Sequence, residues 1–263
     1  MGVILEVQGL TKRYGGLEAN KDLTFSVAER QVYGIAGPNG AGKTTLFDMI
    51  SGHTPPTSGT IRFRGEEIQQ LQPEEVCHRG IARTFQTPVV FGTQSVLANA
   101  LVGSAFGRQG GSVKGGSVAP TLRFRPEEID EALAALEFVG LLDKQAQLAE
   151  TLSVFDKKRL MIASALATRP KLLMLDEPVG GLNRAEREQL VELVRKVNAA
   201  GVTVLIIEHV MKALLALADR LLIIHHGEKL AEGNPSDVIR DERVVAVYLG
   251  EQARDLVAAL KGG

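Results

Sequence analysis

Apolar residues gather along this 263-residue chain in short runs, most of which have the length of a β-strand. The runs Leu172 to Leu175 and Val202 to Ile207 are each followed by a helical pattern, at 185–199 and 211–218 respectively. Near-continuous apolar strands that alternate with helices indicate a mostly parallel sheet covered on both faces. The predicted strands are 3–7, 23–27, 32–36, 61–64, 172–175, 202–207 and 221–224.

The pattern changes in the middle of the chain, where strand signals vanish from about residue 89 to residue 167. Within this region, 126–139 carries apolar residues at helical spacing, which predicts an amphipathic helix. The segment 103–120 is rich in Gly and Ser and predicts a flexible surface loop. The tail, 241–263, has a polar helical pattern. We therefore expect a helical insertion within an α/β protein.

Composition narrows the class of protein. The formal net charge of −1 and the pI near 6.5 argue against nucleic acid as a partner, because its binders usually carry an excess of Lys and Arg on one face. No stretch approaches the roughly 20 apolar residues that cross a bilayer, and the N-terminus does not resemble a secretory signal. The single cysteine, Cys77, excludes an internal disulfide. We expect a soluble cytosolic protein that serves a membrane only by docking to another chain.

One loop carries the strongest chemical signal. Residues 37–45 match the pattern GxxxxGK[ST], between the apolar run 32–36 and a predicted helix from Lys43 to Ser51. Glycines let backbone N–H groups converge on phosphate oxygens, and the helix N-terminus adds partial positive charge. Lys43 is expected to reach the β- and γ-phosphates, and the Thr44 hydroxyl to bind Mg²⁺. The predicted nucleotide-binding residues of this loop are Gly37, Pro38, Asn39, Gly40, Ala41, Gly42, Lys43, Thr44 and Thr45.

Two carboxylates and a histidine complete the predicted hydrolytic site. Asp176 and Glu177 follow the apolar run that ends at Leu175. Asp176 is the candidate metal residue, and Glu177 is the candidate that orients or deprotonates the attacking water. His209 follows another predicted strand and can face the same edge, with a role near the γ-phosphate. The candidate catalytic residues are therefore Glu177, His209 and Lys43.

Taken together, these motifs resemble the ATP-binding subunit of ABC transporters over essentially the whole chain. The resemblance implies that Tyr14 stacks on adenine, and that Gln86 touches the metal near the contact with the membrane subunit. It implies the fold of a P-loop NTPase: a RecA-like α/β core with a small antiparallel β portion at 1–87 and 158–263, and a helical subdomain at 88–157. ATP and Mg²⁺ are the implied cofactors.

Three short segments resemble, more narrowly, the branched-chain amino acid importers. They are Ala82 to Gln86, Asp176 to Asn183, and Ala246 to Glu251. This likeness implies a subunit that energises uptake of branched-chain or other hydrophobic amino acids, or of a related small solute. It also implies a second ATPase subunit, transmembrane permease subunits and, indirectly, a solute-binding protein. Such a subunit lies at the cytoplasmic face of the inner or plasma membrane.

The family's signature, Leu-Ser-Gly-Gly-Gln, departs from its usual form here and runs from Leu152 to Asp156 as Leu-Ser-Val-Phe-Asp. Ser153 keeps its implied place against the partner subunit's nucleotide. Phe155 is expected to crowd that approach and Asp156 to repel phosphate, although Asp156 is also an ordinary residue for a first helical turn. The altered segment predicts a heterodimer with unequal sites.

Two other functions stay open from the sequence. A soluble ABC ATPase acting in another process usually carries two cassettes or long coiled coils, and this chain shows one cassette and no sustained heptads. The second alternative is a subunit that binds ATP as a clamp and hydrolyses little of it. The altered residues Val154 to Asp156 support this alternative, whereas Glu177 and His209 argue against it.

Overall fold

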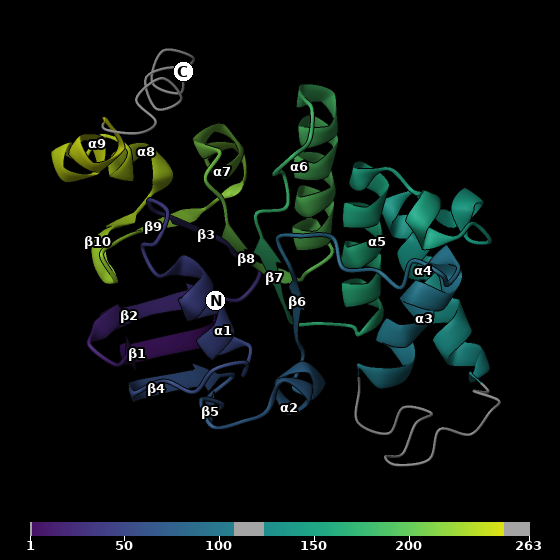
Figure 1. Cartoon of the computed structure of the whole chain (residues 1–263), viewed down its shortest axis with the longest axis horizontal. Helices are drawn as coiled ribbons and strands as arrows, with labels where there is room; N and C mark the ends of the chain where they lie inside the picture. Colours follow the sequence, from purple (N-terminus) through teal and green to yellow (C-terminus); the bar gives the residue numbers. More distant parts are fainter. Residues whose placement is uncertain (1, 108–123, 250–263) are drawn as a thin grey trace.

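The computed structural model describes residues 2–107 and 124–249. Its centre is a six-stranded sheet with the order β10-β9-β3-β8-β7-β6 (Figure 1). β10 pairs antiparallel with β9, and the remaining neighbours pair in parallel. The strands are β3 (Val32–Ala36), β6 (Ile81–Thr84), β7 (Leu172–Asp176), β8 (Thr203–Ile207), β9 (Arg220–His225) and β10 (Glu228–Gly233).

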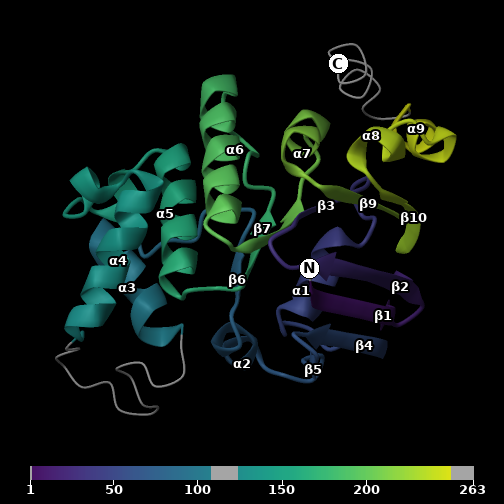
Figure 2. The same cartoon turned by 180° about the vertical axis from the view of Figure 1, so that it is seen from behind.

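A second sheet is antiparallel and has the order β2-β1-β4-β5. It lies at the end of the molecule away from the helical insertion in both views (Figures 1 and 2). Its strands are β1 (Val3–Tyr14), β2 (Leu17–Ala28), β4 (Ser58–Phe63) and β5 (Glu66–Glu67). This sheet contains the predicted strands 3–7 and 23–27 and most of 61–64.

Three helices, α3, α4 and α5, pack on one another to form the helical insertion, seen at one end of the molecule in Figure 2. The helices of the chain are α1 (Lys43–Ile50), α2 (Pro73–His78), α3 (Val96–Phe106), α4 (Pro126–Val139), α5 (Val154–Ala167), α6 (Arg184–Ala199), α7 (Met211–Leu217), α8 (Pro235–Val238) and α9 (Glu242–Leu249). Two short 3-10 turns lie at Leu142–Lys144 and Ala149–Thr151. Among the described residues, no helix combines the length and apolar character that a bilayer crossing requires.

The central sheet is buried on both faces because its side chains alternate between two apolar clusters. On β3, Tyr33 and Ile35 pack with α1 and the antiparallel sheet. On β7, Leu173 and Leu175 pack in the other cluster, to which α5, α6 and α7 contribute. This arrangement confirms the predicted fold class: a P-loop type α/β core, a small antiparallel sheet and a helical insertion.

Some elements were not predicted from the sequence. The strand β6 has only four residues, of which two are Arg and Thr, and β10 reads as polar. The predicted domain boundary at 157/158 falls inside α5, which continues to Ala167 and packs on α3 and α4. Most of the predicted Gly- and Ser-rich loop and the tail beyond residue 249 lie outside the described residues.

Candidate functional site

Parallel pairing brings four strand ends to one edge of the central sheet. β3, β8, β7 and β6 are consecutive neighbours, so the segments that follow them lie along the same carboxyl edge. The phosphate loop follows β3, His209 follows β8, Glu177 follows β7, and Gln86 follows β6. Gln86 lies in the loop after an edge strand, ten residues before Val96 begins α3.

The phosphate loop needs glycine where the chain passes close to other backbone. A Cβ on Gly37, whose φ is +153°, would lie 2.1 Å from the Ile224 carbonyl oxygen. A Cβ on Gly42, whose φ is +97°, would lie 2.2 Å from the carbonyl oxygen of Ala19 on β2. Gly42 is also the N-cap of α1 and has no side chain with which to cap it. The first-turn N–H groups of α1 are therefore left for an anion.

Lys43 opens α1 and turns back over the loop. Its side chain is largely buried, and Nζ donates to the carbonyl oxygens of Gly37 at 2.8 Å and Pro38 at 2.9 Å. Burial lowers the pKa of the Lys43 ammonium, and the carboxylates of Glu177 and Asp176 act in the opposite direction. The carboxylates thus stand close enough to Lys43 to affect it, which places a cation and two anions at the loop.

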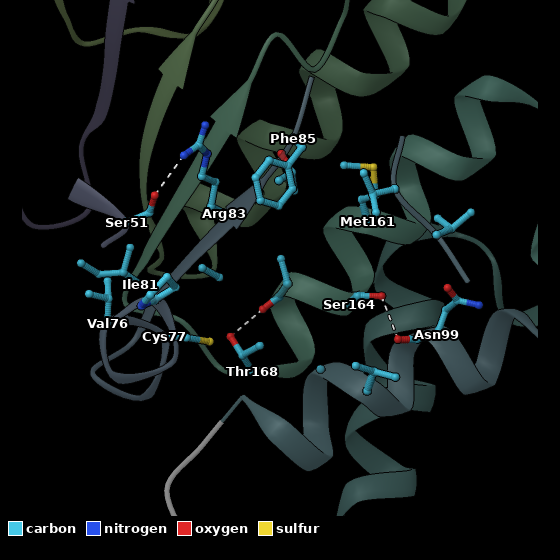
Figure 3. Close-up of a pocket in the computed structure, with 18 of the residues that line it drawn as sticks. Ser51, Val76, Cys77, Ile81, Arg83, Phe85, Asn99, Met161, Ser164 and Thr168 are labelled. Atoms are coloured by element: carbon cyan, nitrogen blue, oxygen red, sulfur yellow. Dashed lines mark hydrogen bonds between the residues drawn. The ribbon is translucent and has the colours of Figure 1, made fainter. Parts of the chain in front are cut away.

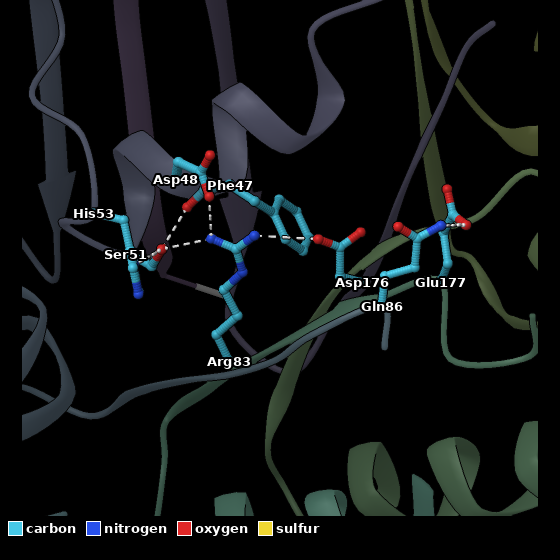
Figure 4. Close-up of polar contacts among 8 residues, drawn as sticks. All are labelled: Phe47, Asp48, Ser51, His53, Arg83, Gln86, Asp176 and Glu177. Atoms are coloured by element: carbon cyan, nitrogen blue, oxygen red, sulfur yellow. Dashed lines mark hydrogen bonds and ion pairs between the residues drawn. The ribbon is translucent and has the colours of Figure 1, made fainter. Parts of the chain in front are cut away.

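Asp176, the last residue of β7, is 4% exposed. Its Oδ2 accepts a hydrogen bond from Nη2 of Arg83, on β6, at 3.1 Å (Figure 4). Burial raises the pKa of Asp176, and the charge and hydrogen bond of Arg83 oppose that rise. Arg83 therefore favours the ionised carboxylate, the form that binds a metal.

Glu177 is held by residues from three other elements. Nε2 of Gln86 donates to its Oε2 at 2.6 Å, and Nδ1 of His209 lies 3.4 Å from the same oxygen. The buried Lys158 of α5 donates through Nζ to the Glu177 carbonyl oxygen at 3.1 Å. The φ of Glu177 is +47°, in the left-handed region that non-glycine residues seldom adopt. The structure therefore brings Gln86, Glu177 and His209 together and fixes the glutamate in a strained backbone conformation.

The donor set is suited to magnesium. Asp176 offers a carboxylate, the exposed Thr44 a hydroxyl and Gln86 an amide oxygen, all hard ligands of the kind that Mg²⁺ prefers. Among the described residues there is no group of three His, Cys, Asp or Glu side chains that would enclose an ion. Such an open set fits Mg²⁺, which usually takes one or two carboxylates and leaves its other positions to phosphate and water.

Two predicted nucleotide residues make only local contacts in the described part of the chain. Tyr14, the last residue of β1, is 49% exposed, and Nζ of Lys12 lies 5.0 Å from the centre of its ring. Ser153 is the exposed N-cap of α5, in the helical layer, and its hydroxyl accepts from the Asp156 N–H at 3.1 Å. The structure leaves both side chains accessible from solvent.

The signature segment differs from the sequence-based expectation. Phe155 is 9% exposed and packs in the core beneath α5, and Asp156 is 5% exposed. Asp156 pairs with Lys144 at 2.5 Å and with Arg159. Both side chains point inward once α5 forms, so the expected crowding by Phe155 was wrong, and for Asp156 the structure agrees with the alternative of an ordinary first-turn residue. The exposed substitution is Val154, at 52%.

Sequence reasoning missed two cations of the site, Arg83 and Lys158. Arg83 donates hydrogen bonds to residues 35 and 93 positions away in the sequence. Lys158 donates to a residue 19 positions away. Arg83 was visible only as part of a short segment before Gln86. No local signal would have marked it, because β6 is too short and too polar to be predicted as a strand and its partners lie on other elements.

Two family models match the chain. The model of the ABC transporter family matches residues 20–180, and the model described as branched-chain amino acid ATP-binding cassette transporter matches residues 228–254. The first covers more than half of the sequence and includes the phosphate loop and both carboxylates.

Curated proteins and solved structures agree with this match. The chain is 37% identical to the high-affinity branched-chain amino acid transport ATP-binding protein LivG of Salmonella typhimurium and 40% identical to BraF of Pseudomonas aeruginosa, over 94% of this chain and 98% of each relative. The ADP conformation of MJ1267, an ATP-binding cassette of an ABC transporter, superposes with a TM-score of 0.86 at 32% identity, over 95% of this chain and 100% of that one. This chain belongs to the ABC transporter family, as one of its ATP-binding, ATP-hydrolysing subunits.

Proposed function

We propose that this chain hydrolyses Mg-ATP to energise uptake of branched-chain or other hydrophobic amino acids, or of a related small solute. The names of the relatives, which cover nearly the whole chain, support the transported class. The observation that carries the hydrolytic role is the gathering of Lys43, Asp176, Glu177 and His209 along one sheet edge. A subunit built in this way acts by closing on ATP with a partner and reopening after hydrolysis.

The proposed roles follow from the positions of the side chains. Lys43 and the loop N–H groups bind the β- and γ-phosphates, and Tyr14 stacks on the adenine. Thr44, Asp176 and Gln86 would hold Mg²⁺, which when bound supplies positive charge against the phosphate oxygens.

Glu177 is placed to orient or deprotonate the attacking water. His209, next to Glu177, is proposed to contact the γ-phosphate and to keep the glutamate oriented.

The second ATPase subunit is proposed to be a different chain. Each nucleotide would lie between one subunit's phosphate loop and the other's signature segment. Here the phosphate loop is intact, while the exposed Val154 stands where the family has glycine. A β-branched side chain at this point keeps backbone N–H groups further from the phosphate than glycine does. The partner's nucleotide, which would use this segment, is therefore expected to turn over more slowly.

The remaining partners are proposed to be two permease subunits and, through them, a solute-binding protein, with the chain at the cytoplasmic face of the membrane. A pocket of about 360 Å³ lies between β6 and the helical insertion (Figure 3). Three apolar side chains on its lining are exposed: Phe85 at 41%, Val89 at 68% and Phe91 at 59%. Exposed apolar groups of this kind favour a protein contact, and no role with nucleic acid is proposed.

Uptake of labelled amino acids tests this function. Cells that lack the chain are complemented with the wild type or with Glu177→Gln, and uptake of leucine, isoleucine and valine is measured. We expect the wild type alone to restore uptake. Normal uptake without the chain, or with the Glu177→Gln variant, would refute the proposed function. Equal turnover at both sites of the assembled pair would refute the unequal-site proposal and leave the substrate class untouched.

A further inference from the structure

Arg83 is a buried cation whose contacts extend beyond the metal carboxylate Asp176. It lies on β6, at the edge of the central sheet, with a side chain that is 5% exposed. Its Nη1 donates to Oδ1 of Asp48 at 2.7 Å and to Oγ of Ser51 at 3.0 Å, while Nη2 donates to Oδ2 of Asp176 at 3.1 Å (Figure 4). One guanidinium thus ties the last turn of α1 to the end of β7.

The surroundings of Arg83 hold its side chain in one orientation. The guanidinium carbon lies 5.5 Å from the centre of the Phe47 ring and 5.0 Å from that of Phe85. A planar guanidinium held between aromatic rings and hydrogen-bonded at two nitrogens has little freedom to rotate. Its third nitrogen, Nε, is buried without a hydrogen-bond partner among the described residues.

The carboxylate at one end of this bridge is the proposed metal residue. Asp176 is 4% exposed, so its carboxylate is almost wholly buried. Arg83 supplies the opposing charge and engages one of the two carboxylate oxygens. Orientation of a metal carboxylate by an outer hydrogen-bonding partner is a recognised determinant of metal affinity.

We propose that Arg83 is a positioning residue that orients the Asp176 carboxylate for Mg²⁺, by bridging it to Asp48 on α1 and to Ser51, the C-cap of that helix. The proposal rests on the nucleotide site described above and adds a residue to it. Arg83 acts through Asp176, to which it donates a hydrogen bond. Because α1 starts at the phosphate loop, the bridge sets the distance between the metal carboxylate and the helix that carries Thr44.

The same arginine reaches the wall of the pocket in Figure 3. Ser51, Phe85 and His53 line that pocket together with Arg83. Nδ1 of His53 lies 2.9 Å from Oγ of Ser51, and the edge of its ring meets Phe85 at 5.8 Å between ring centres. The bridge therefore links a surface of the pocket to the metal carboxylate.

The test measures metal-dependent nucleotide binding without reference to hydrolysis. A fluorescent ATP analogue is titrated onto the wild type, Arg83→Met and Arg83→Lys, first in EDTA and then across Mg²⁺ concentrations. Arg62→Met is the matched control, because Arg62 pairs with Glu67 on the exposed antiparallel sheet. We expect Arg83→Met to weaken apparent Mg²⁺ affinity by about tenfold or more while binding in EDTA changes by less than about twofold.

Arg83→Lys keeps the positive charge beside Asp176 but cannot bridge to both partners at the end of α1, so we expect an intermediate loss. Wild-type Mg²⁺ dependence in a folded Arg83→Met protein overturns the inference, as does an equal loss of binding in EDTA. If Arg83→Met fails to fold, Arg83→Lys decides: wild-type Mg²⁺ dependence overturns the inference. Failure of the wild type itself to bind nucleotide refutes the nucleotide site, which is a different result.

Discussion

Two helices of this chain begin at segments that are proposed to face ATP, and they are built differently. α1 begins behind Gly42, which offers no capping side chain, so its first N–H groups are open to an anion. α5 begins behind Ser153, whose hydroxyl caps the Asp156 N–H, while Asp156 itself lies in the core. The first helix is shaped to receive phosphate from outside, and the second already satisfies part of its own N-terminus. In the proposed dimer, the chain's own half of an ATP site keeps the residues expected of it, whereas the half offered to a partner is altered at Val154.

Among the changes that test this difference between α1 and α5, replacements of glycine in the phosphate loop are expected to have the largest effect. Gly42→Ala places a Cβ 2.2 Å from the Ala19 carbonyl oxygen, so we expect loss of nucleotide binding and a free energy of unfolding lower by about 3 kcal/mol. Gly40→Ala is the matched control: its φ of +77° strains the residue, but nothing lies within 4 Å of its Cβ. We expect a loss of about 1 kcal/mol there. Urea unfolding and ATP titration measure both; equal behaviour of the two variants would contradict the role given to close packing.

Lys43→Met separates phosphate binding from folding. Removing the ammonium takes away a charge directed at the phosphates, and we expect hydrolysis to fall by about 100-fold or more. Methionine fits a buried site, so the free energy of unfolding without nucleotide should change by less than about 1 kcal/mol. Thermal unfolding with and without ATP measures both effects, with Lys212→Met on the exposed side of α7 as the control. Retention of ATP-induced stabilisation in Lys43→Met would refute its proposed contact.

Asp156 provides the corresponding test at the start of α5. Burial acts to raise the pKa of Asp156, but hydrogen bonds and charge from Lys144 and Arg159 outweigh it and lower the pKa below its ordinary value. Stability from the ionised form is therefore present above about pH 4, the unfolded value, and is lost as pH falls through the lower folded value. We expect Asp156→Asn to lower the free energy of unfolding by about 2 kcal/mol at pH 7.

The difference between Asp156→Asn and the wild type should stay constant from about pH 7 to pH 5 and shrink below about pH 4. Urea unfolding across this range measures it. A variant as stable as the wild type at pH 7 would show that the carboxylate is not structurally engaged.

Val154→Gly gives the smallest expected change and tests the signature segment directly. Glycine restores close backbone approach, and we expect turnover at the partner's nucleotide to rise by about tenfold in the assembled pair. Glycine in the first turn should also lower the free energy of unfolding by about 1 kcal/mol. Single-turnover hydrolysis of the nucleotide bound at the partner's phosphate loop measures the first effect. No gain in turnover would remove Val154 as the source of unequal sites.

The fold and half of the site were predictable because their signals are local. The run Val32–Ala36, the glycine pattern after it and the helix from Lys43 follow one another directly in the sequence, and the structure shows the same order. Asp176 and Glu177 were found because an apolar strand ends at them. The side-chain directions at Phe155 and Asp156 were not predictable, since they depend on which face of α5 packs inward.

Arg83 shows why the rest required a structure. Its partners come from α1 and β7, and β6 is too short and too polar to be predicted as a strand. Nothing adjacent in the sequence marks Asp48 or Ser51 as part of the site. For Asp156, the one local signal was Arg159 three residues later, at the spacing of a helical ion pair.

Hydrolysis of Mg-ATP by the purified chain, with nucleotide binding measured in parallel, tests the central claim most directly. Wild type, Glu177→Gln and the control Glu188→Gln, an exposed residue of α6, are compared alone and with the second ATPase subunit. We predict that all three bind ATP and that Glu177→Gln lowers turnover at this chain's own site by about 100-fold or more. Failure of the wild type to bind ATP, or equal turnover by Glu177→Gln and wild type, would contradict it.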